Sequence, residues 1–238
     1  MRLKANRQDL EMALRRSWRR RYLSPVLFGL YAELLPCLRN YATGAVLDAG
    51  CGVMPFREEM ERLAASYQSL DVQRRAPEVD IIADLQDMPQ VASETYDLVV
   101  CSEVLEHVPR PDRATAEVAR ILKPNGIFVI SVPHLSRLHE EPHDFYRYTH
   151  HGIRYLLENA GFQVIRIVPI GSLFSFLGHQ LSTIIVCGTW NIPVVRHVAF
   201  WLNAALVTLP CNLLDRLPFM RQKMPVGYVA VGVKRPIA

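Results

Sequence analysis

Residues 46–52 read Val46-Leu47-Asp48-Ala49-Gly50-Cys51-Gly52, an apolar run that ends in an acidic residue and a G-x-G turn. Glycine lacks a Cβ atom, so Gly50 and Gly52 can bring main-chain N–H groups close to a ligand. A dinucleotide fingerprint would require a third glycine at position 55, where this chain has Pro55. The stretch therefore predicts a strand of an α/β sheet that ends at a nucleoside-like ligand, and it argues against a nicotinamide or flavin dinucleotide.

Further apolar runs follow at the spacing of an α/β sheet. They end at Asp71-Val72, at Asp84-Leu85, at Cys101-Ser102 and at Pro133. The runs lack strict alternation of apolar and polar residues, which is typical of a parallel sheet covered on both faces. Asp71, about twenty residues after the first strand, is placed to accept hydrogen bonds from two ribose hydroxyls. The runs together predict a nucleoside site at their carboxyl ends.

In this order the motifs resemble those of the class I S-adenosylmethionine-dependent methyltransferases, in particular a bacterial group with the pattern LDxGCG, D, ADL, FDLVxxxxVLEHV, LKPGG. The resemblance covers about residues 45–170 and a terminal strand, and the variant from Gly50 to Phe56 is similar to a subgroup associated with surface-glycan biosynthesis. Asn125 stands where the pattern usually has glycine, a change that a turn tolerates because Asn also enters the left-handed region.

The fold that this resemblance implies is a Rossmann-like, seven-stranded, mostly parallel sheet with helices on both faces. Residues 162–168 are its expected sixth strand, after a helix over 149–160. Residues 227–234 form the expected last strand, which returns antiparallel between the fifth and the sixth. We expect three parts: a basic helical cap (1–42), a cofactor-binding domain (43–169 and 227–236) and an apolar helical insertion (170–226).

S-adenosyl-L-methionine is the cofactor that the resemblance implies. Asp48 and the turn backbone hold its amino-acid end, Asp71 binds the ribose, Asp84 contacts the adenine, and Cys101 and Ser102 line the floor near the sulfonium. Taken singly, Asp48 could instead cap the turn and Asp71 could be a solvated strand-end carboxylate. The full set of expected cofactor contacts is Asp48, Ala49, Gly50, Cys51, Gly52, Asp71, Val72, Asp84, Leu85, Cys101 and Ser102.

A general base is the next requirement if the acceptor is a sugar hydroxyl, because the pKa of such a hydroxyl is far above neutral. His107 follows the fourth strand, although it could instead organise the loop. His139, His143 and Tyr146 follow the fifth strand, in a stretch similar to the subgroup pattern H-x-x-P-x-D-[FY]-x-R-[FY]-T. Arg147 in the same stretch either binds an anionic group of the acceptor or pairs with Asp144.

No metal site is expected in this stretch. Pro142 interrupts a helical H-x-x-x-H arrangement, and the spacing of the histidines fits no zinc pattern. The five cysteines are odd in number and show no C-x-x-C spacing, which indicates reduced thiols in a cytoplasm.

Positive charge is concentrated at the N-terminus, although the whole chain of 238 residues carries a net charge of only +4. Eight of the 27 Lys and Arg residues lie within positions 1–21. No apolar core and cleavage site follow these arginines, so a secretory signal is not expected. The location argues against a nucleic-acid groove and favours an arm that meets phosphates or anionic lipid.

The first helix is expected over residues 5–22, with Leu10, Leu14 and Trp18 on one stripe that packs on the domain or lies on a membrane surface. A second helix begins at Ser24-Pro25 and continues to about Arg39.

The expected insertion over 170–226 is unusually apolar. No Asp, Glu, Lys or Arg occurs between Arg166 and Arg196, and leucines recur at helical spacing from Leu202 to Leu217. Its length permits a membrane span, but Gly178, Asn191 and Pro210 interrupt it. Interfacial docking, a lipid-substrate groove, and a helical lid or dimer surface remain as alternatives.

These observations together predict a methyltransferase that acts on a small or lipid-linked acceptor, a sugar hydroxyl first, with a quinone-like ring or a carboxylate as alternatives. The rival hypothesis is a non-catalytic, membrane-associated nucleotide-binding module. We expect a cytoplasmic protein with no nucleic-acid partner. Contact with the inner face of the membrane through the basic helix and the insertion, and a homodimer, are both left open.

Overall fold

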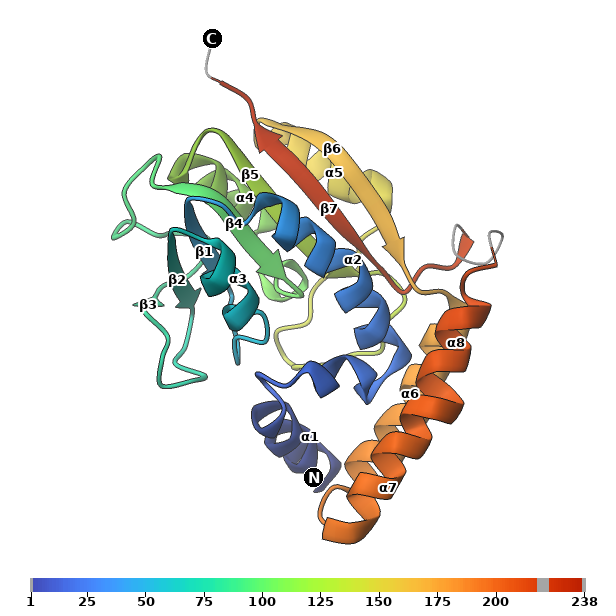
Figure 1. Ribbon diagram of the computed structural model, residues 1–238. Coiled ribbons are helices and arrows are strands. Elements are labelled where there is room, and N and C mark those ends of the chain that lie inside the picture. The colour runs from blue at the N-terminus through green and yellow to red at the C-terminus, as the bar shows by residue number, and fades with distance from the viewer. Residues whose placement is uncertain (1, 218–222, 237–238) are drawn as a thin grey trace. The chain divides into compact units, whose positions relative to one another are not determined.

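The structure is a computed structural model that describes residues 2–217 and 223–236, without the side chains of residues 2–5, 7 and 8 (Figure 1). Residues 218–222 of the expected insertion, Met1 of the expected cap and several of the N-terminal basic side chains therefore lie outside the described part. The chain divides into two units: residues 1–33 with 169–226, and residues 34–168 with 227–238. We call them the helical unit and the sheet unit.

The sheet unit is built on seven strands in the order β3-β2-β1-β4-β5-β7-β6. β1 pairs in parallel with β2 and β4, and β5 pairs antiparallel with β7, with Val129 opposite Val231. This arrangement confirms the predicted fold class, including the last strand between the fifth and the sixth. The strands are β1 (Ala45–Ala49), β2 (Ser66–Asp71), β3 (Ile81–Ile82), β4 (Tyr96–Ser102), β5 (Leu122–Pro133), β6 (Phe162–Ile170) and β7 (Gly227–Lys234).

Helices cover both faces of this sheet because its strands are apolar on both sides. α4 (Pro111–Ile121) and α5 (His150–Asn159) lie on one face, and α3 (Arg57–Leu63) lies on the other with the C-terminal part of α2 (Pro25–Tyr41) (Figure 1). Val118 and Leu157 from the first pair of helices join a buried cluster with Leu47 and Phe128 of the sheet. The core therefore holds the strands rigid and leaves their carboxyl ends to carry the functional residues.

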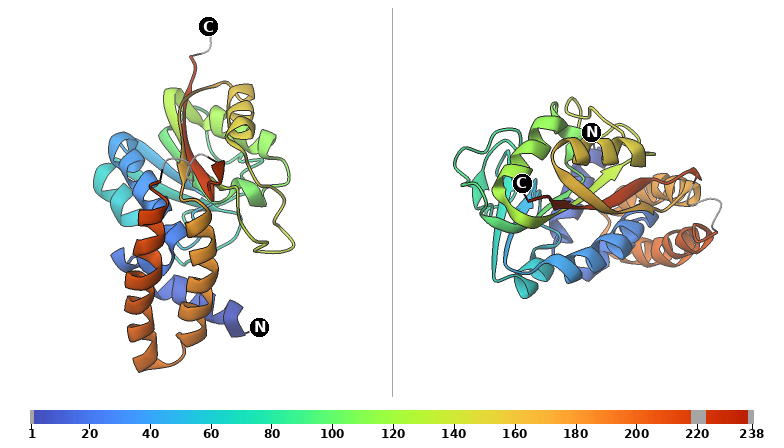
Figure 2. Two further views of the ribbon diagram at one scale, coloured as in Figure 1. Left: turned by 90° about the vertical axis from the view of Figure 1, so that its right-hand side faces the viewer. Right: turned by 90° about the horizontal axis from the view of Figure 1, so that it is seen from above.

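The helical unit contains two antiparallel helical segments that lie side by side (Figures 1 and 2). One is α6 (Leu173–Thr189). The other runs without a break through α7 (Pro193–Asn203), a π-helical turn η3 (Ala204–Thr208) and α8 (Leu209–Leu214). α1 (Arg2–Ala13) and η1 (Trp18–Leu23) pack against them, with Leu10 and Leu23 in one buried cluster with Val186 and Phe200.

Two helices begin where the sequence predicted, each with a side-chain N-cap. Ser24 accepts a hydrogen bond from the Leu27 N–H at the start of α2, and Thr149 accepts one from Gly152 at the start of α5. The single helix expected over residues 5–22 is wrong, because α1 ends at Ala13 and η1 begins only at Trp18. Leu10 is buried while Trp18 is 59% exposed, so the expected stripe does not share one environment.

Candidate active site

The turn after β1 takes the backbone conformation that its glycines allow. The N–H groups of Gly50 and Cys51 donate to the Leu70 carbonyl oxygen of β2, at 2.7 and 3.0 Å. Gly50 has φ +73°, and a Cβ atom there would lie 2.5 Å from the side chain of Val104. Gly52 has φ +55°, and a Cβ atom there would meet no atom within 4 Å. Only the Gly52 side of the turn is therefore open to a ligand.

Two buried carboxylates flank this turn. Asp48 is 5% exposed and accepts a hydrogen bond from the Tyr67 hydroxyl at 3.1 Å. Burial raises the pKa of Asp48 to about 7, against the opposing effect of the Tyr67 hydrogen bond and with a further increase from the charge of Asp71. A cationic group of a ligand beside Asp48 would favour its ionised form.

Asp71 joins the end of β2 to the turn. Its Oδ2 atom accepts from the Gly52 N–H at 2.9 Å, and its Oδ1 atom accepts from the Gln73 N–H at 3.1 Å. The carboxylate is 4% exposed, and it can accept further hydrogen bonds because each oxygen has two lone pairs. The expected ribose contact thus lies directly beside the open glycine.

Apolar side chains are exposed next to this acid. Val72 is 61% exposed and Ile82 of β3 is 44% exposed, in contrast to the buried strand residues before them. Asp84, two residues beyond Ile82, is exposed and accepts from the Gln86 N–H, while Leu85 is buried. Apolar surface beside a hydrogen-bond acceptor is the combination that an adenine ring requires.

Cys101 does not lie where the sequence predicted, at the floor of the site. Its side chain is completely buried in the cluster with Leu47 and Phe128, and burial raises the pKa of its thiol well above the ordinary value. The side chain therefore packs in the core instead of lining the floor of the site. Ser102, the next residue, is half-buried, and its hydroxyl lies 2.9 Å from the Ser131 hydroxyl.

The segment after β5 folds back onto the loop after β4. The N–H groups of Phe145 and Tyr146 donate to the Glu106 carbonyl oxygen at 2.8 and 3.2 Å. The Arg147 guanidinium binds both oxygens of Asp144, at 2.6 and 2.8 Å, and its other N–H groups donate to the carbonyl oxygens of residues 136, 137 and 146. All five N–H donors of Arg147 are thus engaged, which supports the structural alternative over anion binding.

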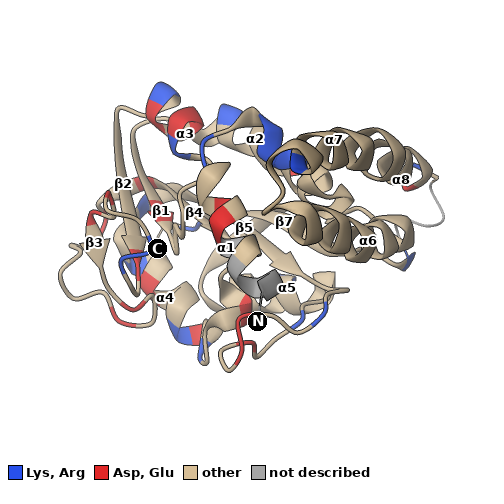
Figure 3. Cartoon of the chain, turned by 90° about the horizontal axis from the view of Figure 1, so that it is seen from below, with Lys and Arg blue, Asp and Glu red and all other residues tan. Residues whose placement is uncertain are grey.

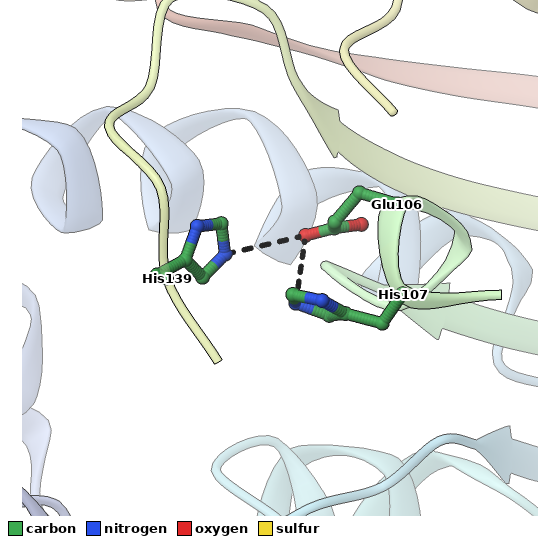
Figure 4. Close-up of side chains that lie close together, drawn as sticks. All are labelled: Glu106, His107 and His139. Atoms are coloured by element: carbon green, nitrogen blue, oxygen red, sulfur yellow. Dashed lines mark ion pairs between the residues drawn. The ribbon is translucent and has the colours of Figure 1, made fainter. Parts of the chain in front are cut away.

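This folding brings three titratable side chains together (Figure 4). The His107 Nε2 atom lies 3.6 Å and the His139 Nε2 atom 3.9 Å from the Glu106 Oε1 atom. The Nδ1 atoms of His107 and His139 lie 2.6 and 3.1 Å from the carbonyl oxygens of His143 and Arg137. Because a carbonyl oxygen only accepts, each Nδ1 atom carries a proton, and the Nε2 atom of each ring is turned toward Glu106.

Burial sets the charge of this cluster. Glu106 is 0% exposed, and burial together with the charge of Glu103 raises its pKa well above the ordinary value. Burial also lowers the pKa of His139, so that the ring is neutral near pH 7. The His139 Nε2 atom is therefore able to accept a proton.

Glu106 is the site residue that sequence reasoning missed. Its carboxylate and the rings of His107 and His139 have ligand atoms within 4.8 Å of one another, a grouping that can hold a metal ion or share a proton. The sequence predicted no metal site, because only the histidine spacing was considered. The available signal was the Glu-His pair at the end of the fourth strand.

The two other expected proton acceptors lie differently. His143 is exposed and contributes its carbonyl oxygen to His107. The Tyr146 hydroxyl donates to the Pro109 carbonyl oxygen at 2.9 Å, so it is held by the neighbouring loop. Of the four expected catalytic residues, only His107 and His139 converge on one another, with ring centroids 4.8 Å apart.

Comparison with known proteins agrees with this geometry. Residues 16–167 match the family model described as a methyltransferase domain. A ubiquinone biosynthesis O-methyltransferase of Xanthomonas oryzae pv. oryzae is 36% identical over 108 residues, which are 39% of this chain and 44% of that protein. Its counterpart in Ralstonia nicotianae is 32% identical over 102 residues, 37% of this chain and 43% of that protein. The chain thus spans less than half the length of these relatives.

Among solved structures, the fold is similar to a putative S-adenosylmethionine-dependent methyltransferase from Listeria monocytogenes. The TM-score is 0.56 at 16% identity, over 88% of this chain and 99% of that one. At this identity the likeness concerns the fold alone, whereas the family match covers the turn after β1, Asp71 and the histidine cluster together. The chain therefore belongs to the methyltransferase domain family, whose fold implies S-adenosylmethionine as the cosubstrate.

Proposed function

We propose that this chain transfers a methyl group from S-adenosylmethionine to a hydroxyl oxygen of a small acceptor, and that the sheet unit binds the methyl donor. The observation that carries the proposal is the turn after β1, where the Asp71 carboxylate is bonded to the open Gly52 main chain and Asp48 is buried beside it. S-adenosylmethionine, when bound, supplies an electrophilic methyl group on a positively charged sulfur.

The residues present fit that donor. Asp48 would pair with its α-ammonium group, Asp71 with its ribose hydroxyls, and the exposed apolar side chains of Val72 and Ile82 with its adenine ring. The space beside the Gly52 Cα atom is empty, so the donor could lie against this backbone. A side chain at position 52 would occupy the same space.

The acceptor that the relatives support is an aromatic hydroxyl of a quinone precursor, because the two relatives above are named for ubiquinone biosynthesis. We expected a sugar hydroxyl first from the sequence, and these relatives do not support it. A phenol has a pKa of about 10, far lower than that of an alcohol, so a neutral imidazole can assist its ionisation.

The chain's own part in the reaction is to position the acceptor and remove its proton. His139, neutral and with the Nε2 lone pair turned toward Glu106, would accept the phenolic proton. Asp144, whose oxygen accepts from the His139 main-chain N–H at 2.8 Å, fixes the backbone that carries the ring.

Turnover with defined acceptors tests the proposal. The purified chain is incubated with methyl-labelled S-adenosylmethionine and, in parallel, with an isoprenoid-substituted catechol, a sugar acceptor and a membrane extract. We expect label in a methyl ether of the catechol. His139→Asn should reduce turnover by roughly 10²- to 10⁴-fold while binding S-adenosylhomocysteine unchanged.

The outcomes separate the competing functions. Label in the sugar alone would favour a sugar hydroxyl as the acceptor, as we expected from the sequence. Label in the extract but in neither compound would show that the acceptor is neither a catechol nor that sugar. S-adenosylhomocysteine binding with no labelled product anywhere would favour the non-catalytic module. His151→Asn, an exposed histidine of α5 away from the cluster, serves as the matched control and should retain full turnover.

A further inference from the structure

The two antiparallel segments of the helical unit, residues 173–214, have an inverted distribution of polar and apolar side chains. We call them the helical hairpin. Ser175, Ser182, Asn203 and Thr208 are 0–1% exposed. Large apolar side chains on the same helices are turned outward: Ile184 is 65%, Val198 57%, Leu206 69% and Leu213 66% exposed. A helix that faces water has the opposite arrangement.

Two buried polar side chains join the helical segments: Asp215, just after α8, binds the start of α6, and Asn203 of α7 binds η1. The Asp215 carboxylate accepts hydrogen bonds from the main-chain N–H groups of Ser172 and Ser175, at 2.8 and 3.1 Å, at the start of α6. The Asn203 side chain donates to the Leu23 carbonyl oxygen at 3.2 Å. A Cβ atom on Gly178 would lie 2.6 Å from the Cys211 sulfur, so the helices approach closely at a small residue. Small and polar residues at helix contacts are typical of helices packed in lipid.

The outer face is long and almost without charge. Figure 3 shows the hairpin helices largely free of charged residues, and Arg196 is the only Asp, Glu, Lys or Arg in residues 173–214. Residues 193–214 are apolar and long enough to cross a membrane. Only 33% of the 18-residue stretch that gives them this apolar character is buried. An exposed apolar surface of this extent marks a binding surface.

Aromatic and basic residues border this face. The rings of Trp18 and Trp201 lie 6.2 Å apart, and both side chains are about half exposed, at 59% and 47%. The Arg19 guanidinium lies 4.7 Å from the Phe200 ring centroid, and that of Arg196 lies 5.3 Å from the Trp190 ring centroid. Tryptophan and arginine next to apolar surface are typical of the boundary between lipid headgroups and acyl chains.

The positive charge of the helical unit favours binding to anionic lipids. Its sequence contains twelve Lys and Arg residues against four Asp and Glu residues, a net charge of +8, whereas the whole chain has +4. The basic residues from Arg15 to Arg21 belong to the same unit as the hairpin. A second copy of this unit would bring a further +8 to the contact, so self-association on this face is opposed by charge.

We propose that the outer face of the helical hairpin, together with Arg15–Arg21, docks this protein onto the surface of an anionic phospholipid bilayer. The exposed leucine, isoleucine and valine side chains enter the acyl boundary, and the arginines bind lipid phosphates. The proposal goes beyond methyl transfer, because it assigns a separate unit to holding the enzyme at a membrane.

Tryptophan fluorescence of the full chain gives a direct test, since Trp18, Trp190 and Trp201 are the only tryptophans and all lie in the helical unit. The probes are vesicles of phosphatidylcholine alone and of phosphatidylcholine mixed with phosphatidylglycerol. With the mixed vesicles we expect co-sedimentation, a blue shift of the emission and quenching by lipids brominated in their acyl chains. Raising the salt concentration should weaken binding, because it screens the arginines.

Matched variants separate the two contributions. Leu206→Asn with Leu213→Asn should weaken vesicle binding by roughly tenfold or more, since two exposed leucines lose their burial in lipid. Tyr155→Asn on α5, 71% exposed in the sheet unit, is the control and should bind as the unmodified chain does. Arg16→Gln with Arg21→Gln should weaken binding to the anionic vesicles by roughly tenfold, whereas Arg154→Gln in the sheet unit should not.

Three results would overturn the proposal. The first is a chain that binds neither vesicle, whether it is monomeric or forms a dimer that the leucine variants dissociate. The second is equal, salt-insensitive binding to both vesicles, which would remove the role of the arginines. The third is resistance to extraction by alkaline carbonate, which would indicate an embedded span in place of surface docking. S-adenosylhomocysteine affinity, measured on the same samples, shows independently whether the donor site is intact.

Discussion

At the scale of single residues, Asp71 links the first two strands and is the clearest test of the donor site. Its carboxylate already accepts two main-chain N–H groups, so its removal has a structural and a binding component. Asp71→Asn keeps the shape and one acceptor oxygen but removes the charge. We expect S-adenosylhomocysteine to bind roughly 10- to 100-fold more weakly, the effect of one or two charge-assisted hydrogen bonds to ribose. Isothermal titration calorimetry measures the change.

The control for Asp71 is an acidic residue outside the site. Asp112 lies in the first turn of α4 and binds Arg110 at the surface, so Asp112→Asn should leave the affinity unchanged. An unaltered dissociation constant for Asp71→Asn, with the melting temperature preserved, would show that this carboxylate does not hold the ribose.

Asp48 predicts a pH dependence of stability in the ligand-free protein. Its folded-state pKa of about 7 lies above the usual value for aspartate, so the folded chain binds more protons than the unfolded chain between about pH 4 and pH 7. The contribution of Asp48 to the free energy of unfolding therefore falls as the pH rises through this range, by on the order of 4 kcal/mol. Asp48→Asn should raise the melting temperature at about pH 8 and leave it unchanged at about pH 4.

Tyr67→Phe provides the comparison for Asp48. It removes the hydroxyl that lowers the Asp48 pKa, and so it should extend the loss of stability to higher pH and increase its total. Thermal unfolding followed by circular dichroism across the pH range measures both variants. Parallel curves for Asp48→Asn and the unmodified chain at every pH would contradict the assigned pKa.

The positions of the residues proposed for the donor site could be predicted because they lie at or just after strand ends, and strand ends are visible in local sequence. Asp48, Asp71 and Asp84 follow apolar runs, and parallel strands bring their carboxyl ends to one edge. The burial of Glu106 was not predictable in this way. It depends on residues 139–147 folding back on the loop after β4, a contact between segments more than thirty residues apart that no local pattern encodes.

At the scale of elements, the last strand was predicted correctly and the first helix was not, and the local sequence explains both results. β7 spans Gly227–Lys234 as predicted, because an apolar run between a glycine and a charged end has a clear start and stop. The helix expected over 5–22 breaks after Ala13, and Ser17 caps the short η1 helix by accepting from the Arg19 N–H. The predicted helix over residues 5–22 placed Ser17 in a helix interior. Serine is more favourable as an N-cap, because its hydroxyl can accept a hydrogen bond from a main-chain N–H at the start of a helix.

The segment after β5 gives a prediction at this scale, because one ion pair holds its shape. Asp144→Asn removes the charge that binds Arg147 through two hydrogen bonds and weakens the acceptor for the His139 main-chain N–H. We expect kcat to fall by about tenfold or more as the His139 ring loses its fixed position. The affinity for S-adenosylhomocysteine should stay within about twofold, since the segment contains no residue assigned to the donor.

Asp112→Asn, which breaks an exposed Arg–Asp pair, is the matched control for this ion-pair variant. It should change neither constant, because exposed ion pairs contribute little. Equal losses of kcat and of donor affinity in Asp144→Asn would show instead that the segment forms part of the donor site.

At the scale of the whole molecule, charge and chemistry are divided between the two units. The sheet unit contains fifteen Lys and Arg residues against nineteen Asp and Glu residues, a net charge of −4, opposite in sign to the +8 of the helical unit. From the sequence we expected the N-terminal segment and the insertion to be separate parts. In the structure they form one unit, joined through the buried cluster of Leu10, Leu23, Val186 and Phe200. Their association could not be inferred from sequence because it joins segments about 170 residues apart.

This division predicts that donor binding survives removal of the helical unit. The Val226 N–H donates to the Ile170 carbonyl oxygen at 2.9 Å, so the two ends of the insertion are close enough for a short loop to join them. A variant that lacks residues 1–23, with residues 172–225 replaced by a short Gly-Ser loop, keeps every residue assigned to the donor and the Ser24 cap of α2. We expect its affinity for S-adenosylhomocysteine to stay within about threefold of that of the full chain, and its binding to anionic vesicles to be abolished.

Calorimetry and co-sedimentation measure the two properties, with circular dichroism to verify that the sheet is retained. Lost affinity in a folded variant would mean that the helical unit supplies part of the donor site, and retained vesicle binding would place the membrane contact in the sheet unit.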